Sequence, residues 1–214
     1  MKQNTEELIK RHAYFNRKFF ARWAPYYDLV AFVLKPLRYD AARRLQLPHD
    51  SRVLDVATGT GEQALALAKA GYDVTGIDLS PDMLKRATKK RTSSIKLKFV
   101  HSDATQLPFT SNSFDATTIS FALHDMPYEI RLLVLKEMIR VTKNNGIIMT
   151  IDYLEPSKGL LGAITYRFVR RFETPMYEDF IHKGLLIHLT KVGLVPQTQT
   201  TLFIGQIKIC KNKK

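Results

Sequence analysis

The sequence predicts an α/β fold built on a doubly wound, mostly parallel sheet of seven strands. Between residues 52 and 152, short apolar runs alternate with helical patterns, and the first run leads directly into a glycine turn. Runs this apolar are typical of strands buried on both faces, as in a parallel sheet. Strand–helix alternation of this kind indicates right-handed βαβ units in an open sheet.

Five strands are expected in the central part of the chain. They are Val53–Val56, Val74–Ile77, Leu97–Val100, Ala116–Ser120 and Ile147–Ile151. Near the C-terminus, Val195–Thr200 and Leu202–Ile209 indicate a hairpin that adds an antiparallel edge to the sheet. Residues 211–214 are expected to form a solvated tail.

Helices are expected between the strands and at both ends of the chain. Their ranges are Thr5–Phe20, short helices within Trp23–Tyr39, Glu62–Ala70, Pro81–Arg91, Glu129–Thr142 and Tyr177–Val192, and the segment Leu160–Phe172 is mixed apolar and basic. Ser80 before Pro81 places a capping hydroxyl at a helix start. Gly71 and Gly193 stand where two of these helices are expected to end.

The length of 214 residues suits one α/β domain with lid segments. We expect residues 1–50 to form a helical lid and residues 51–214 the α/β domain, with a lid insertion at about 156–176. The N-terminus has no signal-peptide pattern, and its longest apolar run has six residues. A membrane-spanning helix needs roughly 20. We therefore expect a cytoplasmic protein that does not span a membrane.

The net charge of +13 is concentrated in the two ends of the chain. Residues 1–52 carry a net charge of +6, residues 53–152 of +1 and residues 153–214 of +6. This distribution predicts an anionic partner for the ends, such as a membrane surface, nucleic acid or an acidic substrate, unless the charge serves solubility alone. The single cysteine, Cys210, excludes an intramolecular disulfide. No metal ligand set is predicted, and the oligomeric state stays open.

The segment after the first strand indicates a ligand site. Gly59 and Gly61 allow the backbone to turn sharply and pass close to a ligand, at the sheet edge where open α/β folds bind ligands. The spacing Gly59-x-Gly61-x-x-Ala64 also fits a dinucleotide fingerprint. A pyrophosphate at this helix start would lie beside Glu62, however, whereas acids at Asp55 and Glu62 suit a cation. This favours S-adenosylmethionine, which carries a sulfonium and an ammonium group and no phosphate.

Carboxylates also follow the second and third strands. Asp78 ends the second strand, where it can accept hydrogen bonds from both ribose hydroxyls. Its alternative role is a helix N-cap, although Ser80 already fills that position. Asp103 and Ala104 follow the third strand, where a carboxylate and a backbone amide can bind the adenine edge; a plain turn aspartate is the alternative.

The ordered motifs resemble those of class I S-adenosylmethionine-dependent methyltransferases, which have a Rossmann-like fold. They are Asp55-x-x-x-Gly59-x-Gly61, Asp78, the run from His101 to Phe109, Ser113-Phe114-Asp115 leading to Ile119–Leu123, and Arg140-Val141-x-Lys143-x-x-Gly146. Together they span about half the chain, in order and at family spacing. The resemblance implies direct transfer of a methyl group from the cofactor to an acceptor.

Within that superfamily the chain most resembles the ubiquinone and menaquinone C-methyltransferases. The segment Tyr26-Tyr27-Asp28-Leu29 is similar to that family's Tyr-Asp-Leu segment, and the Ile119-Ser120-Phe121 run is also similar. The resemblance places Thr60, Asp78, Asp103, Ala104 and Ser120 at cofactor-contacting positions, with Leu79 and Met83 flanking the adenine. It implies a small, apolar or lipid-like acceptor such as a quinol.

Two departures from the family pattern stand out. Ala57 replaces the first glycine of the usual loop, which is tolerable if its φ is negative. His124-Asp125-Met126-Pro127 stands where the quinone enzymes commonly carry Arg-Asn, and the chain after Asp152 looks shorter than theirs. The second departure bears on the acceptor and not on the cofactor.

Tyr27 and His124 are the candidate residues on the acceptor side. Tyr27 either closes over the cofactor or packs within the lid, and His124 is either a general base or a hydrogen-bonded lining residue. Aromatic lid residues with basic neighbours suggest an acceptor that partitions into an anionic membrane surface. Alternatives are a phospholipid amine, RNA, or a non-catalytic cofactor-binding protein. Nucleic acid is disfavoured because the chain has no separate RNA-binding module and no Asn-Pro-Pro-Tyr-type motif.

Overall fold

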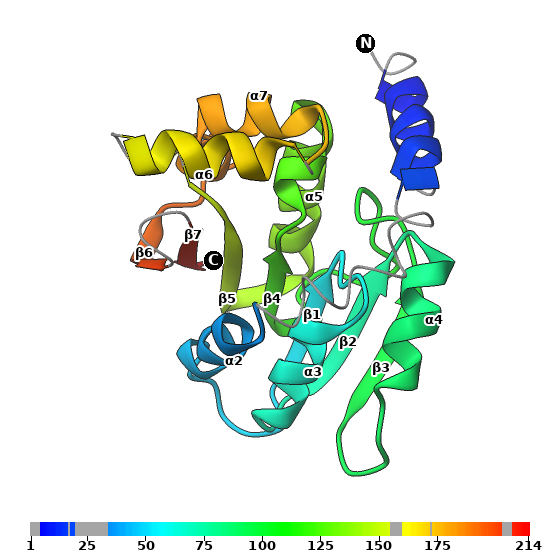
Figure 1. The fold of residues 1–214 in the computed structure, drawn as a ribbon. Coiled ribbons are helices and arrows are strands. Elements are labelled where there is room, and N and C mark those ends of the chain that lie inside the picture. Colours follow the sequence, from blue (N-terminus) through cyan, green and yellow to red (C-terminus); the bar gives the residue numbers. More distant parts are fainter. Residues whose placement is uncertain (1–4, 17, 20–33, 155–159, 172, 203–206) are drawn as a thin grey trace.

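The computed structural model describes residues 5–16, 18–19, 34–154, 160–171, 173–202 and 207–214. At its centre is a seven-stranded sheet in the order β3-β2-β1-β4-β5-β7-β6 (Figure 1). The strands are β1 (Arg52–Val56), β2 (Asp73–Asp78), β3 (Leu97–His101), β4 (Phe114–Ser120), β5 (Thr142–Tyr153), β6 (Pro196–Leu202) and β7 (Ile207–Lys213). Strands β1 to β5 pair in parallel, and β7 is antiparallel to both β5 and β6. The predicted fold class is confirmed.

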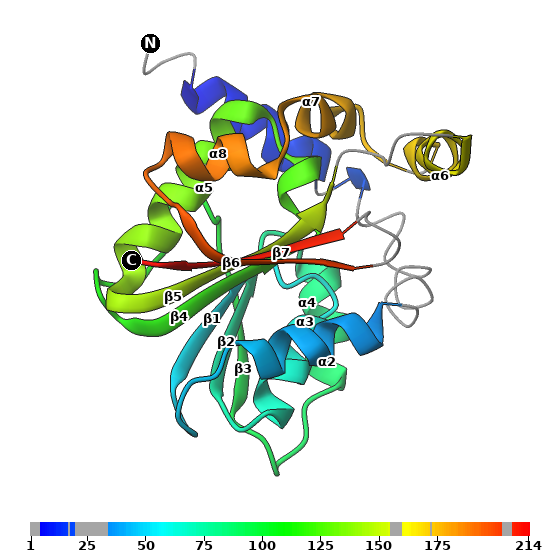
Figure 2. The same ribbon diagram turned by 90° about the vertical axis from the view of Figure 1, so that its left-hand side faces the viewer.

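Helices cover both faces of this sheet, as the doubly wound prediction requires. Residues 5–16 and 18–19 are helical, and the later helices are α2 (Lys35–Arg44), α3 (Glu62–Lys69), α4 (Pro81–Lys89), the 3-10 helix η1 (Leu123–Asp125), α5 (Tyr128–Val141), α6 (Leu160–Arg170), α7 (Met176–Lys183) and α8 (Leu185–Lys191). Figure 2 shows α2 and α3 on one face of the sheet and α5 and α8 on the other.

The alternation of side chains along β1 divides the core into two halves. Val53 packs on one face with Ala41 of α2 and Leu67 of α3. Leu54 packs on the opposite face with Ile130 and other apolar residues of α5. Both faces of β1 are therefore buried, which explains its uninterrupted apolar run. Because β1 pairs with both β2 and β4, the strand order reverses beside β1, and its carboxyl end lies at the switch point.

The start of α4 follows the predicted capping pattern. The hydroxyl of Ser80 accepts a hydrogen bond from the backbone N–H of Met83 at 3.4 Å, and Pro81 is the first helical residue. A proline at this position loses no helical hydrogen bond, because the first N–H groups of a helix have no partner within it. The local sequence alone thus fixes where α4 begins.

Two predictions near the C-terminus are wrong. The expected single helix over 177–192 is broken at Gly184, whose φ of 74° cannot continue a helix, so α7 and α8 are separate. The final strand runs over Ile207–Lys213, so most of the expected tail pairs with β5. Asn212 is fully buried there and donates a hydrogen bond to the carbonyl of Ile148 at 3.0 Å.

Helix α2, which lies within the expected N-terminal lid, packs against the sheet. The buried side chains of Leu37, Ala41 and Leu45 place α2 in the same core cluster as α3. Of the segment Trp23–Tyr39, predicted to form short helices, residues 23–33 lie outside the described residues and residues 35–39 belong to α2. Among the helices that the structure describes, none combines the length and the apolar character needed to cross a bilayer.

Candidate active site

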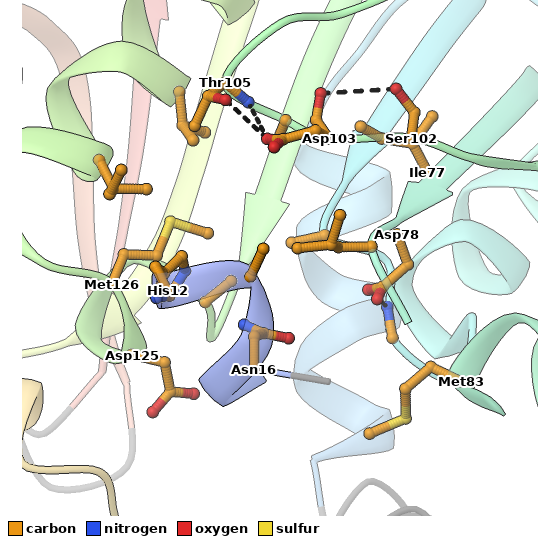
Figure 3. A pocket seen from close by; sticks show the side chains of 18 of the residues that line it. His12, Asn16, Ile77, Asp78, Met83, Ser102, Asp103, Thr105, Asp125 and Met126 are labelled. Carbon is orange, nitrogen blue, oxygen red and sulfur yellow. Dashed lines mark hydrogen bonds between the residues drawn. The ribbon is translucent and has the colours of Figure 1, made fainter. Parts of the chain in front are cut away.

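A cavity lies at the carboxyl ends of β1 to β4, beside the switch point (Figure 3). It contains about 750 Å³ of empty space, part of it open to solvent. Its polar wall includes Gly59, Asp78 and Asp103, and its apolar wall includes Ile9, Phe121, Met126, Ile130 and Val134. The position agrees with the rule that open α/β sheets bind ligands outside the carboxyl ends of their strands.

The conformation of the turn after β1 requires glycine at positions 59 and 61. Gly59 and Gly61 have φ values of 56° and 81°. A Cβ at Gly61 would lie 2.8 Å from Cζ of Phe99 and 2.9 Å from Cβ of Ala87, too close for any side chain. Ala57 also has a positive φ, 51°, so the condition of a negative φ, under which alanine would be tolerated there, is not met. A non-glycine residue in this conformation costs about 1 kcal/mol or more, because its Cβ crowds the following carbonyl oxygen.

Asp78 joins the end of β2 to the glycine turn. Its Oδ2 accepts a hydrogen bond from the N–H of Gly59, and its Oδ1 accepts one from the N–H of Ser80, each at 2.8 Å. Burial raises the pKa of Asp78, and these backbone donors only partly offset the effect. Because each carboxylate oxygen can accept two hydrogen bonds, Asp78 retains capacity for hydroxyl donors in the cavity that it lines.

Asp103 and Ala104 lie in the cavity wall beyond the end of β3. Oδ1 of Asp103 accepts hydrogen bonds from the N–H and the hydroxyl of Thr105, both at 2.7 Å (Figure 3). Asp103 therefore makes the contacts of a plain turn aspartate and also faces the cavity. Leu79 and Met83 line the same cavity.

Asp55 is fully buried behind this wall. Its carboxylate accepts hydrogen bonds from the hydroxyls of Thr58 at 2.6 Å and Thr118 at 2.7 Å. Burial raises its pKa to about 6, against the lowering effect of the two hydroxyls. Glu62 forms an ion pair with Lys90 at 2.7 Å. Of the two predicted acids, Asp55 therefore acts on a ligand only through its field, and the charge of Glu62 is largely neutralised.

The remaining predicted cofactor residues also lie outside the cavity wall. Gly61 shapes the turn, and Thr60 is buried with no partner for its hydroxyl within the described part of the chain. Ser120 accepts a hydrogen bond from Nη1 of Arg38 at 3.1 Å. The structure thus places Gly59, Asp78, Leu79, Met83, Asp103 and Ala104 in the wall, and Asp55, Thr60, Gly61 and Ser120 outside it.

His124 is buried among three carboxylates. Its Nδ1 lies 2.6 Å from Oδ1 of Asp152, and its Nε2 lies 3.1 Å from Oε2 of Glu173 and 3.3 Å from Oδ2 of Asp125. Burial alone would lower the pKa of His124, but the three carboxylates together raise it well above its ordinary value. A protonated imidazole cannot accept a proton, so of the two roles considered for His124 this geometry favours the hydrogen-bonded residue over the general base. Tyr27 lies outside the described residues.

Arg131 connects η1 with α7 and α8. It is fully buried, and it donates hydrogen bonds to the carbonyls of Leu123 and Met176, each at 2.9 Å. Its Nη1 lies 2.8 Å from Oδ2 of Asp179 and 3.0 Å from Nε2 of His188. Burial lowers the pKa of His188, which agrees with a neutral ring that accepts from Arg131. The sequence had not singled out Arg131 as a site residue.

His12 is a cavity residue that the sequence analysis missed. It lies on the N-terminal helix and is buried, and its Nδ1 has no partner within the described residues. Burial lowers the pKa of His12, although the carboxylates of Asp103 and Asp125 partly offset this effect. The available signal was a titratable residue on the apolar face that includes Leu8 and Phe15.

Comparison with known proteins extends these observations. Residues 53–146 match the family model described as a methyltransferase domain. A demethylmenaquinone methyltransferase of Geobacillus kaustophilus is 34% identical over 195 residues, covering 86% of this chain and 79% of that protein. A demethylmenaquinone methyltransferase of Staphylococcus aureus is 40% identical over 137 residues, covering 63% of this chain and 56% of that protein.

Solved structures show the same fold. A putative methyltransferase in complex with the Haloferax volcanii Trm112 activator has a TM-score of 0.74 at 17% identity, covering 92% of this chain and 96% of that one. An S-adenosylmethionine-dependent methyltransferase from Aquifex aeolicus has a TM-score of 0.64 at 20% identity, covering 82% and 88%.

The strand order, the glycine turn and the cavity at the switch point are those of class I S-adenosylmethionine-dependent methyltransferases. Within that class, the chain belongs to the family that includes the demethylmenaquinone methyltransferases. It is an enzyme whose cofactor is S-adenosyl-L-methionine.

Proposed function

We propose that this enzyme methylates a small apolar acceptor such as a quinol. The proposal depends on the continuity of the cavity, in which a wall with Asp78 and Asp103 meets an apolar wall with Phe121, Met126 and Ile130. A nucleoside held at the first wall leaves the second for an apolar ring, and small-molecule sites commonly combine a few polar groups with such a lining. The names of the relatives support the same acceptor class.

The bound cofactor supplies an electrophilic methyl group. The chain's own contribution is to align the acceptor with that group and to exclude water, which accounts for several kcal/mol of rate acceleration in well-oriented reactions. The turn at Gly59 and Asp78 positions the nucleoside. Phe121 and Met126, both buried in the wall, exclude water from the acceptor side.

Methylation of a ring carbon also requires a base, because the ring C–H bond breaks and its proton must leave. His12 lines the cavity, and its lowered pKa keeps it neutral near pH 7 and able to accept that proton. We expect His12→Gln to lower kcat without changing the affinity for S-adenosylhomocysteine. Tyr14→Phe, an exposed position on the same helix, is the matched control.

Helix α6 supports a second part of the proposal, that the enzyme collects its acceptor at an anionic membrane surface. Leu160 is 80% exposed and Ile164 is 55% exposed, and Arg167 and Arg171 are exposed beside them. Apolar and basic side chains together on an exposed helix are typical of interfacial binding, in which the apolar side chains enter the lipid boundary and the cations attract anionic headgroups.

An acceptor assay tests the first part. With radiolabelled cofactor, we expect label in a short-chain demethylated quinol and none in phosphatidylethanolamine. If label appears in the phospholipid amine or in RNA and not in the quinol, that molecule is the acceptor and the quinol proposal fails. Calorimetric binding of S-adenosylhomocysteine, measured on the same preparation, verifies that the cofactor site is intact.

Co-sedimentation with vesicles tests the second part. We expect binding to vesicles rich in phosphatidylglycerol, weaker binding to phosphatidylcholine, and loss of binding in Ile164→Asp. The control is Ile187→Asp on α8, because Ile187 has the same exposed fraction of 55%. Equal behaviour of the two variants, or no binding to anionic vesicles, would remove the membrane from the proposal.

A further inference from the structure

The two nitrogens of His124 have different surroundings. Nδ1 makes one short contact, 2.6 Å to Oδ1 of Asp152, as expected for a charge-assisted hydrogen bond. Nε2 faces two carboxylates, Glu173 at 3.1 Å and Asp125 at 3.3 Å. A ring nitrogen carries at most one hydrogen, so one N–H makes a linear hydrogen bond to only one of the two oxygens. A single linear hydrogen bond therefore leaves the second carboxylate on the Nε2 side without a hydrogen.

The spacing on that side fits the spacing of ligands around a metal ion. Zinc bonds to imidazole nitrogen and carboxylate oxygen measure about 2.0–2.2 Å, which at tetrahedral angles separates neighbouring ligand atoms by about 3.4 Å. The observed separations from Nε2 are 3.1 and 3.3 Å. Across the described parts of the chain, His124, Asp125 and Glu173 are the group whose ligand atoms all lie within 4.8 Å of one another.

His124 and Glu173 make further hydrogen bonds of the kind that orient metal ligands. Asp152 binds the Nδ1 side of His124 and also accepts a hydrogen bond from the N–H of Leu123 at 3.0 Å, which fixes the orientation of the ring. Carboxylate–histidine–metal arrangements have this form. The hydroxyl of Tyr153 donates to Oε1 of Glu173 at 2.9 Å, which leaves Oε2 for a cation.

The charge of the cluster and one unpaired oxygen point the same way. Three carboxylates surround a single imidazole, and Asp125 is only 8% exposed. Its Oδ1 is buried without a hydrogen-bond partner within the described residues, although Asp125 lines the cavity. A buried carboxylate oxygen without a donor is costly, and buried charges are normally paired or bound to metals.

We infer that Nε2 of His124 and the carboxylates of Asp125 and Glu173 bind a divalent cation of the zinc or manganese class at the edge of the cavity. Imidazole with carboxylates suits these metals. Three protein ligands leave an open position, which takes water or an oxygen of a bound molecule. His124 must be deprotonated to bind, so the cation replaces the imidazole proton. The inference does not depend on the identity of the methyl acceptor.

The test uses the full-length protein after dialysis against a chelator. We expect one equivalent of Co²⁺ to give the visible absorption of a low-symmetry site, and Zn²⁺ to displace it with a calorimetric stoichiometry of one. Glu173→Gln should weaken binding by about tenfold or more, since it removes one ligand. Glu178→Gln, an acid in α7 that pairs with Arg170, is the matched control and should bind as the parent protein does.

Glu173→Gln is preferred to a His124 variant because the Glu173 side chain is 17% exposed and glutamine can still hydrogen bond to Tyr153. Circular dichroism and affinity for S-adenosylhomocysteine report whether the variant is folded. Absence of saturable binding with a stoichiometry of one overturns the inference, as does equal affinity of the two glutamine variants. If the parent protein binds the cation but transfers no methyl group to the quinol, the proposed function fails and the metal site stands.

Discussion

The two halves of the sheet's carboxyl edge hold their carboxylates in different ways. Beside β1 and β2, threonine hydroxyls hold Asp55 and backbone N–H groups hold Asp78. Around the ends of β4 and β5, the imidazole of His124 holds Asp152, and the guanidinium of Arg131 joins η1 to the helices that follow. Neutral donors leave the first half with a negative potential, which suits a sulfonium cofactor. These contacts hold the second half in a fixed position.

The largest effect should come from disrupting the contacts of Arg131 in the second half. We expect Arg131→Met to lower the free energy of unfolding by about 3–5 kcal/mol, because it removes four hydrogen bonds from a buried, charged donor. Urea denaturation measures the change. Arg170→Met is the control, since Arg170 pairs with Glu178 at the surface and should cost about 1 kcal/mol or less. Similar losses in the two variants would show that the buried cluster does not hold this half together.

The next effect tests the negative potential of the first half. The pKa of Asp55 is about 6 when folded, above its ordinary value of 3.8. The folded protein therefore binds more protons between these values, so this group's contribution to stability falls as the pH rises from about 4 to about 6 and is constant above.

We therefore expect Asp55→Asn to stabilise the cofactor-free protein at pH 8 by up to about 3 kcal/mol. The threonine hydroxyls can rotate to accept from the new amide. The same variant should bind S-adenosylmethionine more weakly, because the negative field is lost. Thermal melts at pH 4.5 and pH 8 with calorimetric binding check both parts. A destabilised variant at pH 8 would contradict the argument.

A smaller effect sharpens the role of Asp78. Asp78→Ala should weaken S-adenosylhomocysteine binding by about 10- to 100-fold, the loss expected for hydrogen bonds to a charged group of about 1.5–3 kcal/mol. Asp82→Ala is the control, because Asp82 is exposed in the first turn of α4. Unchanged affinity of the Asp78 variant by isothermal titration would rule out ribose contact at this carboxylate.

The smallest effect concerns the turn that follows β1, in the first half of the edge. Ala57→Gly should stabilise the protein by up to about 1 kcal/mol, since glycine adopts a φ of 51° without steric cost. Ala163→Gly in exposed α6 should have the opposite sign, costing about 1 kcal/mol. Chemical denaturation distinguishes them, and a destabilising Ala57→Gly would mean that Ala57 carries no strain.

The same comparison separates what sequence predicts from what it does not. The glycine turn and the cap at Ser80 depend on neighbouring residues, so their patterns are visible along the chain. His124 and Glu173 are 49 positions apart and meet only because α7 packs against η1. Residue types do not reveal that packing.

Two further misses have related causes. The amphipathic pattern continues on both sides of Gly184, which hid the break between α7 and α8. The lysines of β7 gave residues 211–214 the composition of a tail, although Asn212 between them is buried. Composition alone does not indicate that one polar residue among charged neighbours is buried in a strand.

The helix break at Gly184 has a chemical consequence. Gly184 becomes the N-cap of α8, and its carbonyl accepts a hydrogen bond from Nδ1 of His188 at 2.8 Å. That bond leaves Nε2 of the same ring without a hydrogen, and it is the atom that receives Arg131. The carbonyl at the start of α8 thus favours one tautomer of His188, whose Nε2 can accept a hydrogen bond from the buried guanidinium of Arg131.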